Sequence, residues 1–388
     1  MNRIHLVAGN ELTLLQNGAT YFPQLCADID AAKRSIYLES YILASDETGQ
    51  LVAQAMQRAA KRGVRVRVLL DGFGSAELPP QFVEELHNAG VEVQWFRREI
   101  SPFTLSRSRM RRLRRMHRKL AVIDGIVAFV GGINIISDIP DKPGFDAPRL
   151  DYAVRVQGEL AAEVQAVMQR LWEMVCWAAF RKRIREEGWR SYRIRRQPDA
   201  SMRLIVRDNI RHRRDIERAY LRAIAGAQHE VIIANAYFLP GRLFLRALVH
   251  AARRGVRVLL VLQGKVEYRL QHYATQALYG RLLASGVEIY EYHASYLHAK
   301  VAVVDGEWCT VGSFNIDPFS LLLAREANLV VRDAGFAGAL RNSLLEAIGK
   351  DGRRVEIVHS NLFRHIVASM SYGFVRFLIG ILGIARKH

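Results

Sequence analysis

The sequence predicts an α/β protein built from two similar halves in a pseudo-twofold arrangement, with one site at their interface and an amphipathic helix at the C-terminus. Two observations predict this fold. A pattern of eighteen positions, HxKxxxxDxxxxxxG(G/S)xN, occurs at 117–134 and again at 298–315. Around both copies, apolar β-branched runs alternate with stretches of helical periodicity, which is typical of sheets covered by helices.

The duplication extends beyond the two motifs, as an internal repeat should. Three further pairs of segments match at offsets of 196, 192 and 196 residues: Ile36–Tyr41 with Ile232–Tyr237, Arg62–Val66 with Arg254–Val258, and Ala89–Val93 with Ser285–Ile289. The offset falls to 181 at the histidines, so the first half carries extra chain between Gly90 and His117.

The predicted organisation has four parts: a first half at 1–158, a helical and basic bridge at 159–200, a second half at 201–358, and a C-terminal segment at 359–388. Val52–Lys61 and Phe244–Arg253 are predicted helices, and each is followed by a glycine and then a strand. The bridge is expected to begin with a long helix at Leu160–Arg185. A chain of 388 residues is long enough for two such cores.

Each motif is predicted to form a β-hairpin. His and Lys stand two residues apart, so a strand points both side chains to one face. Asp124-Gly125 is a strong signal for a tight turn, and a two-residue loop there places His117 opposite Gly132. The same geometry in the second copy places His298 opposite Ser313. A small residue at this position leaves room beside the imidazole.

The paired residue types fit a phosphodiester substrate. Its non-bridging oxygens need cations and hydrogen-bond donors as charge develops on phosphorus, and the candidates are Lys119, Lys300, Asn134 and Asn315. One neutral imidazole can attack phosphorus, while the other protonates the leaving alkoxide and later deprotonates the incoming hydroxyl. This chemistry needs neither a metal nor a cofactor, and none is predicted.

Two other interpretations of the motifs remain open. A lone histidine on an apolar strand is more often a satisfied interior residue than a catalyst, although duplication with constant spacing argues against that here. A metal site is disfavoured because Asp124 and Asp305 lie seven positions from their histidines and should point away from them. Gly72 and Gly74 are too few and wrongly spaced for a nucleotide-binding loop.

At these residues the chain resembles the phospholipase D superfamily, whose signature is the doubled HKD motif. Within that superfamily it is similar to the bacterial cardiolipin synthases of the B type. The segments that carry this second resemblance are Gly9–Glu11, Leu15–Gly18, Leu69–Ser75, Arg115–Lys119 and Glu230–Phe238. The resemblance covers nearly the whole chain, and it implies two phospholipase D-type halves that share one active site.

The resemblance also implies roles for single residues. His117 would be the nucleophile, and His298 the general acid and base. An acidic residue downstream of each motif would hold the other nitrogen of the motif's histidine, and the candidates are Asp151, 34 residues after His117, and Glu326, 28 residues after His298. The motif aspartates belong to the family signature too, although the hairpin geometry makes them supports of the turn and not proton carriers.

The charge of the chain predicts a polyanionic partner. The net charge is +18 with a pI near 10.2, which suits an acidic lipid surface or nucleic acid. Much of the excess lies just before His117, where arginines alternate with apolar residues in a way that suits a headgroup layer. The predicted headgroup-binding residues are Arg107, Arg109, Arg111, Arg112, Arg114 and Arg115. A solvated flexible loop is the alternative.

The C-terminal segment is expected to lie at a membrane interface. Asn361–Ile384 is largely apolar, but Arg364, His365 and Arg376 interrupt it, and no charge-free run reaches the roughly 20 residues that a spanning helix needs. An interfacial amphipathic helix fits better, with a helix docked on the core as the alternative. At the N-terminus, 1–7 is too short and polar for a signal peptide or membrane helix, unlike cardiolipin synthases with N-terminal membrane helices.

Together, the resemblance and the charge imply a phosphatidyltransferase acting on an anionic phospholipid membrane. Phosphatidylglycerol is the expected donor, with phosphatidylethanolamine as an alternative, and the acceptor is an alcohol, most simply the glycerol headgroup of a second phosphatidylglycerol. We expect peripheral attachment to the cytoplasmic face of a bacterial inner membrane and no nucleic-acid partner. Two rivals remain: a nuclease of the same superfamily, whose arginines would hold a phosphate backbone, and a non-catalytic lipid-binding scaffold.

Overall fold

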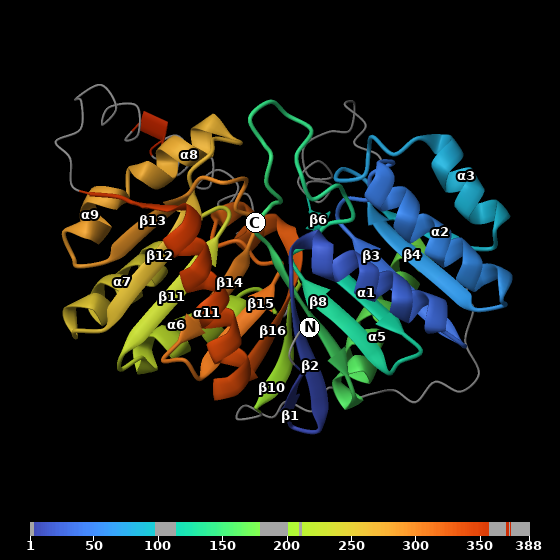
Figure 1. Ribbon diagram of the computed structural model, residues 1–388, viewed down its shortest axis with the longest axis horizontal. Coiled ribbons are helices and arrows are strands. Elements are labelled where there is room, and N and C mark those ends of the chain that lie inside the picture. The colour runs from blue at the N-terminus through green and yellow to red at the C-terminus, as the bar shows by residue number, and fades with distance from the viewer. Residues whose placement is uncertain are drawn as a thin grey trace.

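The computed structural model describes residues 4–97, 114–178, 201–208 and 212–356, together with residues 370, 371 and 373. In this part of the chain, two mixed sheets stand side by side, and helices cover them (Figure 1). The first half runs from blue to green and the second from yellow to red, with β8 and β16 close to the line where they meet (Figure 1). The predicted α/β fold with two similar halves is confirmed.

The first half, with the helix that follows it, contains nine strands and four helices among the described residues. The strands are β1 (Ile4–Val7), β2 (Asn10–Gln16), β3 (Ser35–Ser40), β4 (Arg65–Asp71), β5 (Glu92–Phe96), β6 (Arg115–Met116), β7 (Lys119–Ile123), β8 (Val127–Gly131) and β9 (Tyr152–Gln157). The helices are α1 (Asn17–Ala31), α2 (Glu47–Lys61), α3 (Pro80–Asn88) and α5 (Glu159–Ala178).

The second half contains eight strands and six helices among the described residues. The strands are β10 (Met202–Arg207), β11 (Glu230–Asn235), β12 (Arg257–Gln263), β13 (Glu288–Tyr292), β14 (Lys300–Val304), β15 (Trp308–Gly312), β16 (Ala324–Arg332) and β17 (Gly352–Arg354). The helices are α6 (Asp215–Gly226), α7 (Arg242–Arg253), α8 (Arg269–Gln276), α9 (Tyr279–Leu283), α10 (Pro318–Leu323) and α11 (Ala334–Asp351).

The two sheets repeat one strand order. The first contains β2-β9-β8-β7-β3-β4-β5, and the second contains β10-β16-β15-β14-β11-β12-β13. In both, the last three strands are parallel to one another and the remaining neighbours are antiparallel. The internal repeat predicted from sequence offsets is therefore a repeat of topology, and each HKD motif opens the same central hairpin, β7-β8 or β14-β15.

The predicted C-terminal ends of two helices agree with the structure, although both helices begin earlier than predicted, at Glu47 and Arg242. Val52–Lys61 lies within α2, and Phe244–Arg253 lies within α7. Gly63 and Gly255 follow these helices with φ of 85° and 90°, a left-handed conformation that glycine adopts without strain. This turn reverses the chain into β4 and β12, whose apolar residues are covered on the outer side by helices α1 to α3 and α6 to α9.

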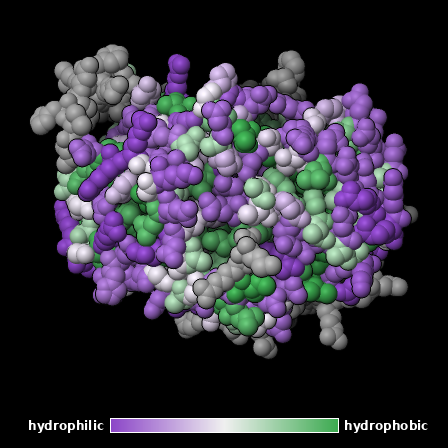
Figure 2. Space-filling model, viewed as in Figure 1, coloured by the Kyte–Doolittle hydropathy of each residue, from purple (hydrophilic) through white to green (hydrophobic). Residues whose placement is uncertain are grey.

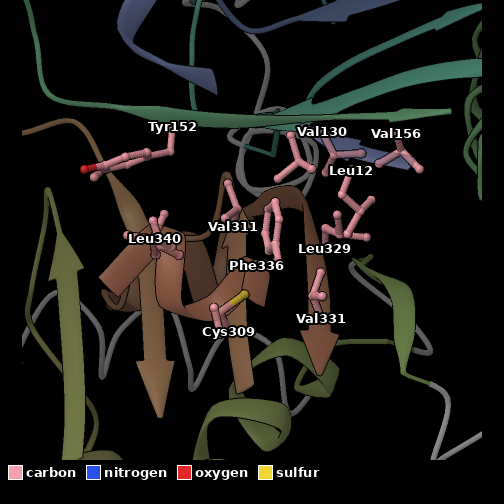
Figure 3. Packing of buried hydrophobic residues seen from close by; sticks show 14 of the residues in the cluster. Leu12, Val130, Tyr152, Val156, Cys309, Val311, Leu329, Val331, Phe336 and Leu340 are labelled. Atoms are coloured by element: carbon pink, nitrogen blue, oxygen red, sulfur yellow. The ribbon is translucent and has the colours of Figure 1, made fainter. Parts of the chain in front are cut away.

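A shared hydrophobic core joins the halves. β8 and β9 lie against β15 and β16, and their facing side chains are fully buried (Figure 3). Figure 3 shows Val130 and Val156 from the first sheet above Val311 and Leu329 from the second, with Phe336 of α11 between them. Burying such side chains contributes about 1.5–3 kcal/mol each. The interface is thus built like a domain interior, which holds the two motifs at fixed positions.

The bridge helix and the C-terminal helix are described only in part. The bridge helix was expected to run to Arg185, but α5 is described only to Ala178, and 179–200 lies outside the described residues. α5 packs on β5, β7, β8 and β9 and also touches β10, so it links the two halves. The C-terminal helix expected at 361–384 lies outside the described residues, apart from 370, 371 and 373.

The predicted hairpin register is wrong by one residue. Asp124 and Gly125 do form the expected turn, with φ of 54° and 72°, and the N–H of Ile126 donates to the carbonyl of Ile123 at 3.0 Å. Ile126 is an extra residue, however, because Ile123 pairs with Val127. In the second copy Glu307 is the extra residue, since Val304 pairs with Trp308. The histidines therefore do not stand opposite Gly132 and Ser313 in their own hairpins.

The outer surface is mainly polar on the face shown in Figure 2, where hydrophobic side chains form small separate groups. Among the described residues, no helix combines the length and the apolar character needed to cross a bilayer.

Candidate active site

The two histidines are held in place by the opposite halves. The backbone N–H of His117 donates to the carbonyl of Arg325 at 2.9 Å, and β6 pairs in parallel with the start of β16. The backbone N–H of His298 donates to the carbonyl of Leu150 at 2.9 Å. The chain just before His117 thus forms a short strand beside β16, and Leu297, just before His298, forms a single β-bridge with Leu150, so each motif is anchored at the interface by the opposite half.

The histidine side chains pair with carboxylates across the interface. Nδ1 of His117 lies 3.0 Å from Oε2 of Glu326, and Nδ1 of His298 lies 2.6 Å from Oδ2 of Asp151. The two acidic residues are those that the resemblance implied, but the expected pairing with the histidine of the same half is wrong, because each carboxylate contacts the histidine of the other half. With Nδ1 engaged, Nε2 is the ring nitrogen left for a substrate.

Both motif lysines are buried beside the histidines. Nζ of Lys119 donates to the carbonyl of His117 at 2.8 Å, and Nζ of Lys300 donates to the carbonyl of His298. Burial and the charge of Lys300 lower the pKa of Lys119 to about 7. Burial lowers the pKa of Lys300 to about 8, against the opposing pull of Asp151 and Glu326. Two buried lysines, of which Lys300 lowers the pKa of Lys119, suit a site for an anion.

The histidines and their carboxylates differ in electrostatics. Burial lowers the pKa of His117 and lowers that of His298 well below its usual value, so both imidazoles favour the neutral form in the free protein. Burial alone would raise the pKa of Glu326, but His117, Lys119 and a hydrogen bond from Ser313 outweigh it and the pKa falls. Burial raises the pKa of Asp151 to about 6. Glu326 therefore favours the ionised form more strongly than Asp151 does.

The Gly-Gly and Gly-Ser sequences of the motifs place different residues beside the two carboxylates. Ser313 Oγ donates to Glu326 Oε2 at 2.6 Å, so the longer carboxylate is held by a hydroxyl. At Gly132 an added Cβ would lie 2.4 Å from Oδ1 of Asp151, so only glycine leaves room for the shorter carboxylate. These small residues were predicted to stand beside the imidazoles of their own hairpins. Instead, the carbonyl of Ser313 lies 3.2 Å from Nδ1 of His117 in the other half.

The two motif asparagines are both buried, and they are bonded differently. Asn134 Oδ1 accepts from the backbone N–H of Ile42 at 3.3 Å. Asn315 Oδ1 has no hydrogen-bond partner within the part of the chain that the structure describes. The open atom of Asn315 is a hydrogen-bond acceptor, so it suits a donor group on a polar ligand.

The motif aspartates are bonded to backbone groups at the turns. Asp124 accepts from the N–H groups of Lys33, Arg34 and Ser35 at 2.8 Å each. Asp305 accepts from Gln228, His229 and Glu230, also at 2.8 Å each. Each carboxylate thereby secures the start of the neighbouring strand, β3 or β11. This placement fits the supporting role expected from the hairpin geometry.

Two features of the site were missed in the sequence. The ring of Tyr41 packs edge-on against His117 with centroids 4.8 Å apart, and Nζ of Lys119 lies 5.1 Å from the Tyr41 ring centroid. Arg118 forms a buried ion pair with Glu39 of β3 at 2.8 Å, which anchors the motif strand from its other side. The tyrosine had a signal, because Tyr41 and Tyr237 end one pair of matched repeat segments.

Of the predicted headgroup arginines, Arg107, Arg109, Arg111 and Arg112 lie outside the described residues. Arg114 and Arg115 are described, and the guanidinium of Arg115 lies 4.9 Å from the ring centroid of Phe73. Within the described ranges, no group of three or more His, Cys, Asp and Glu side chains is arranged to hold a metal ion.

Comparison with known proteins assigns the chain to a family. A family model described as "Cardiolipin synthase, PLD-like domain" matches residues 25–172 and 220–348, which correspond to the two halves. The chain therefore belongs to the family of cardiolipin synthases with phospholipase D-like domains, as the resemblance along the chain predicted.

Individual relatives agree with this family. Cardiolipin synthase B of Shigella flexneri is 41% identical over 348 residues, covering 90% of this chain and 83% of that protein. Cardiolipin synthase B of Salmonella typhi is 42% identical over 359 residues with the same coverage. The crystal structure of phosphatidylserine synthase from Haemophilus influenzae matches with a TM-score of 0.69 at 15% identity, covering 94% of this chain and 93% of that one, which supports the fold.

Proposed function

We propose that this protein is a cardiolipin synthase that transfers the phosphatidyl group of one phosphatidylglycerol to the glycerol hydroxyl of another, releasing glycerol. The observation that carries the proposal is the pair of crossed histidine–carboxylate contacts beside two buried lysines. Family membership supports the phosphatidyltransferase chemistry.

In the first step, Nε2 of His117 attacks the phosphorus of the donor lipid. A P–N bond forms, the P–O bond to the headgroup breaks, and His298 gives a proton to the departing glycerol oxygen. Glu326 stabilises the positive charge that develops on the His117 ring, because it stands 3.0 Å from Nδ1. The product of this step is a phosphohistidine that carries the diacylglycerol phosphate.

In the second step, the now neutral His298 removes the proton from the hydroxyl of an acceptor headgroup. The acceptor oxygen attacks phosphorus, and the P–N bond breaks to return neutral His117 and release cardiolipin. Water would give phosphatidic acid in place of cardiolipin. A site in which both lysines and both carboxylates are buried restricts water and favours a bound headgroup.

Lys119 and Lys300 are proposed to hold the non-bridging oxygens as charge grows on the pentavalent state, with Asn134 and Asn315 as further partners. In the free protein the lysines repel one another. A bound phosphodiester would supply the missing negative charge, raise the pKa of both lysines, and favour the protonated form of His298 that the first step requires.

The location is also a proposal: a peripheral position at the cytoplasmic face of a bacterial inner membrane. The net charge of +18 favours an anionic surface, and the arginine-rich segment directly precedes the catalytic motif in the chain. The C-terminal segment would add apolar contact with the interface.

The test is direct. Purified protein is incubated with phosphatidylglycerol vesicles, and the products are identified by mass spectrometry and glycerol release. Cardiolipin and glycerol should appear in equal amounts, and the His117→Ala protein should form neither. Phosphatidic acid as the main lipid product would show a hydrolase, and undiminished product from His117→Ala would contradict the proposed site.

A further inference from the structure

A small cavity with both apolar and polar lining residues lies beside the His298 motif. It has a volume of about 30 Å³ and lies where β11 and β12 end and α8 begins. Among the residues that line it are Tyr237, Gln263, Glu267, Tyr268 and Gln271. A volume of this size holds about two water-sized groups. The cavity therefore suits a small polar moiety and not a bulky one.

The cavity adjoins groups assigned to catalysis. Oε1 of Gln263 accepts from the backbone N–H of Leu297, the residue before His298. The backbone N–H of Ala236, another lining residue, donates to the carbonyl of Ala299 at 2.9 Å. Glu267 acts electrostatically on Lys300. The cavity thus lies on the His298 side of the site, where the headgroup would leave and the acceptor would enter.

The lining offers both an acceptor and a donor. The hydroxyl of Tyr237 donates to Oε2 of Glu267 at 2.7 Å, which orients the carboxylate and leaves it further capacity to accept. Nε2 of Gln263 is buried and has no hydrogen-bond partner within the described residues. A buried N–H donor without a partner carries a free-energy penalty that a ligand oxygen would remove.

The first half lacks these open groups at the matching positions. At the repeat offset of 192 residues, Gln263 corresponds to Asp71 and Glu267 to Ser75. Asp71 accepts from the backbone N–H groups of Met116, Phe73 and Gly74, at 2.7, 2.9 and 3.1 Å. Ser75 is buried and donates to the carbonyl of Tyr41 at 3.0 Å. The side chains of Asp71 and Ser75 are thus bonded to nearby backbone groups, whereas their counterparts Gln263 and Glu267 line a cavity.

We propose that this cavity is the subsite for the glycerol headgroup, in which Glu267 accepts from its free hydroxyls and Gln263 donates to one of them. The inference rests on the proposed phosphatidyl transfer and adds its headgroup selectivity. A glycerol headgroup ends in two free hydroxyls, and the volume holds these two hydroxyls and not the whole headgroup. Each hydroxyl both donates and accepts, so it satisfies the carboxylate and the amide together. An ammonium group would pair with Glu267 but offers no acceptor to the Gln263 N–H, so ethanolamine would leave that donor without a partner.

The test is a competition between acceptors within one reaction. Protein and phosphatidylglycerol vesicles are mixed with deuterated glycerol and 1-propanol, and mass spectrometry measures the ratio of deuterated phosphatidylglycerol to phosphatidylpropanol. This ratio reports acceptor selectivity and does not depend on how much of a variant is folded. Glu267→Gln should lower it roughly tenfold, because a hydrogen bond to a charged group is replaced by a neutral one. Gln263→Glu, which keeps the acceptor for Leu297, should lower it too.

Controls separate the subsite from general charge effects. Glu307→Gln removes a carboxylate from an exposed position in the same half and should leave the ratio unchanged. An unchanged ratio in Glu267→Gln would overturn the subsite. A parallel competition between ethanolamine and 1-propanol would also overturn it if Glu267→Gln lowered that ratio more than the glycerol ratio. Absence of every transfer product from the unaltered protein would instead overturn the proposed function, and the subsite with it.

Discussion

Nδ1 of His117 lies 3.0 Å from the carboxylate of Glu326, although the two residues belong to different halves of the molecule. The second pair, His298 with Asp151, crosses the interface in the opposite direction at 2.6 Å. Neither half contains both members of a pair, so the site is assembled by the packing of β8 and β9 on β15 and β16. Changes that loosen this interface should affect catalysis before they affect the outer cores.

Removing the charge of either carboxylate should reduce turnover with little loss of folded protein. Glu326→Gln and Asp151→Asn keep the side-chain size but weaken the hold on Nδ1, and we expect activity to fall roughly 10- to 100-fold for each. Asp146→Asn, at an exposed position, is the matched control. Initial rates on phosphatidylglycerol vesicles measure the effect, and a loss smaller than twofold in both variants would contradict the assigned pairs.

Phosphodiester affinity should fall as the pH rises from near neutrality. The pKa values of Lys119 and Lys300 are about 7 and about 8 in the free protein, and a bound anion raises them. Well below pH 7 both lysines are already protonated, so binding causes no proton uptake by them. Above pH 7 they are partly neutral and take up protons when the anion binds, so affinity declines with rising pH. Calorimetry with glycerophosphoglycerol in buffers of different ionisation enthalpy measures this uptake.

The Lys119→Met variant tests whether the proton uptake comes from the lysines or from other titrating groups. Lys119→Met should lower the affinity and should also reduce the proton uptake between pH 7 and 9. Uptake that is unchanged in this variant, or an affinity that rises with pH in the unaltered protein, would contradict the assignment of the buried lysines to the anion.

The two small residues beside the carboxylates should respond differently to alanine. Gly132→Ala places a Cβ 2.4 Å from Oδ1 of Asp151, so the carboxylate must move away from His298 and activity should fall about as far as in Asp151→Asn. Ser313→Ala removes one hydrogen bond to Glu326 and should cost roughly tenfold or less. Equal rates for Gly132→Ala and the unaltered protein would show that Asp151 is not needed where it lies.

The motif aspartates should matter for stability more than for chemistry. Asp124→Ala and Asp305→Ala each remove an acceptor for three backbone N–H groups, and we expect about 1–3 kcal/mol less free energy of unfolding for each. Urea unfolding at neutral pH measures this. Activity per folded molecule should remain within severalfold. A large loss of turnover with unchanged unfolding would contradict the supporting role.

The pH dependence of that stability has a definite sign. Burial alone would raise the pKa of Asp124, but the N–H groups of Ser35, Lys33 and Arg34 outweigh it and lower the pKa. An aspartate whose pKa is lower in the folded protein than in the unfolded one stabilises the folded state at pH values above its unfolded pKa of about 3.9. This stabilisation is lost as the pH falls through the lower pKa of the folded protein. The stability difference between Asp124→Ala and the unaltered protein should therefore shrink in acid.

The fold and the identity of the central residues could be predicted because they depend on local signals. Repeat offsets fixed the pairing of segments such as Ile36–Tyr41 with Ile232–Tyr237, and these became the equivalent strands β3 and β11. Glycines after the helices gave their ends. The Asp-Gly turns formed as expected, because Asp and Gly both tolerate positive φ.

What the sequence could not provide depends on contacts between distant segments. One extra residue after each turn, Ile126 or Glu307, shifts the hairpin register, and nothing local distinguishes it from the first residue of the next strand. The crossing of the carboxylates follows from how the sheets pack, which spacing along the chain does not encode. The cavity near Glu267 was also missed, because it arises from the meeting of β11, β12 and α8.

The most direct test of the account is covalent trapping on His117. The His298→Ala protein is mixed with a radiolabelled phosphatidyl ester of p-nitrophenol, a leaving group that needs no acid, so that the intermediate forms but cannot be resolved by the missing base. We predict that the label becomes bound to the protein, that a peptide containing His117 carries it, and that the His117→Ala, His298→Ala double variant retains none. Equal labelling of the double variant would contradict the proposed mechanism.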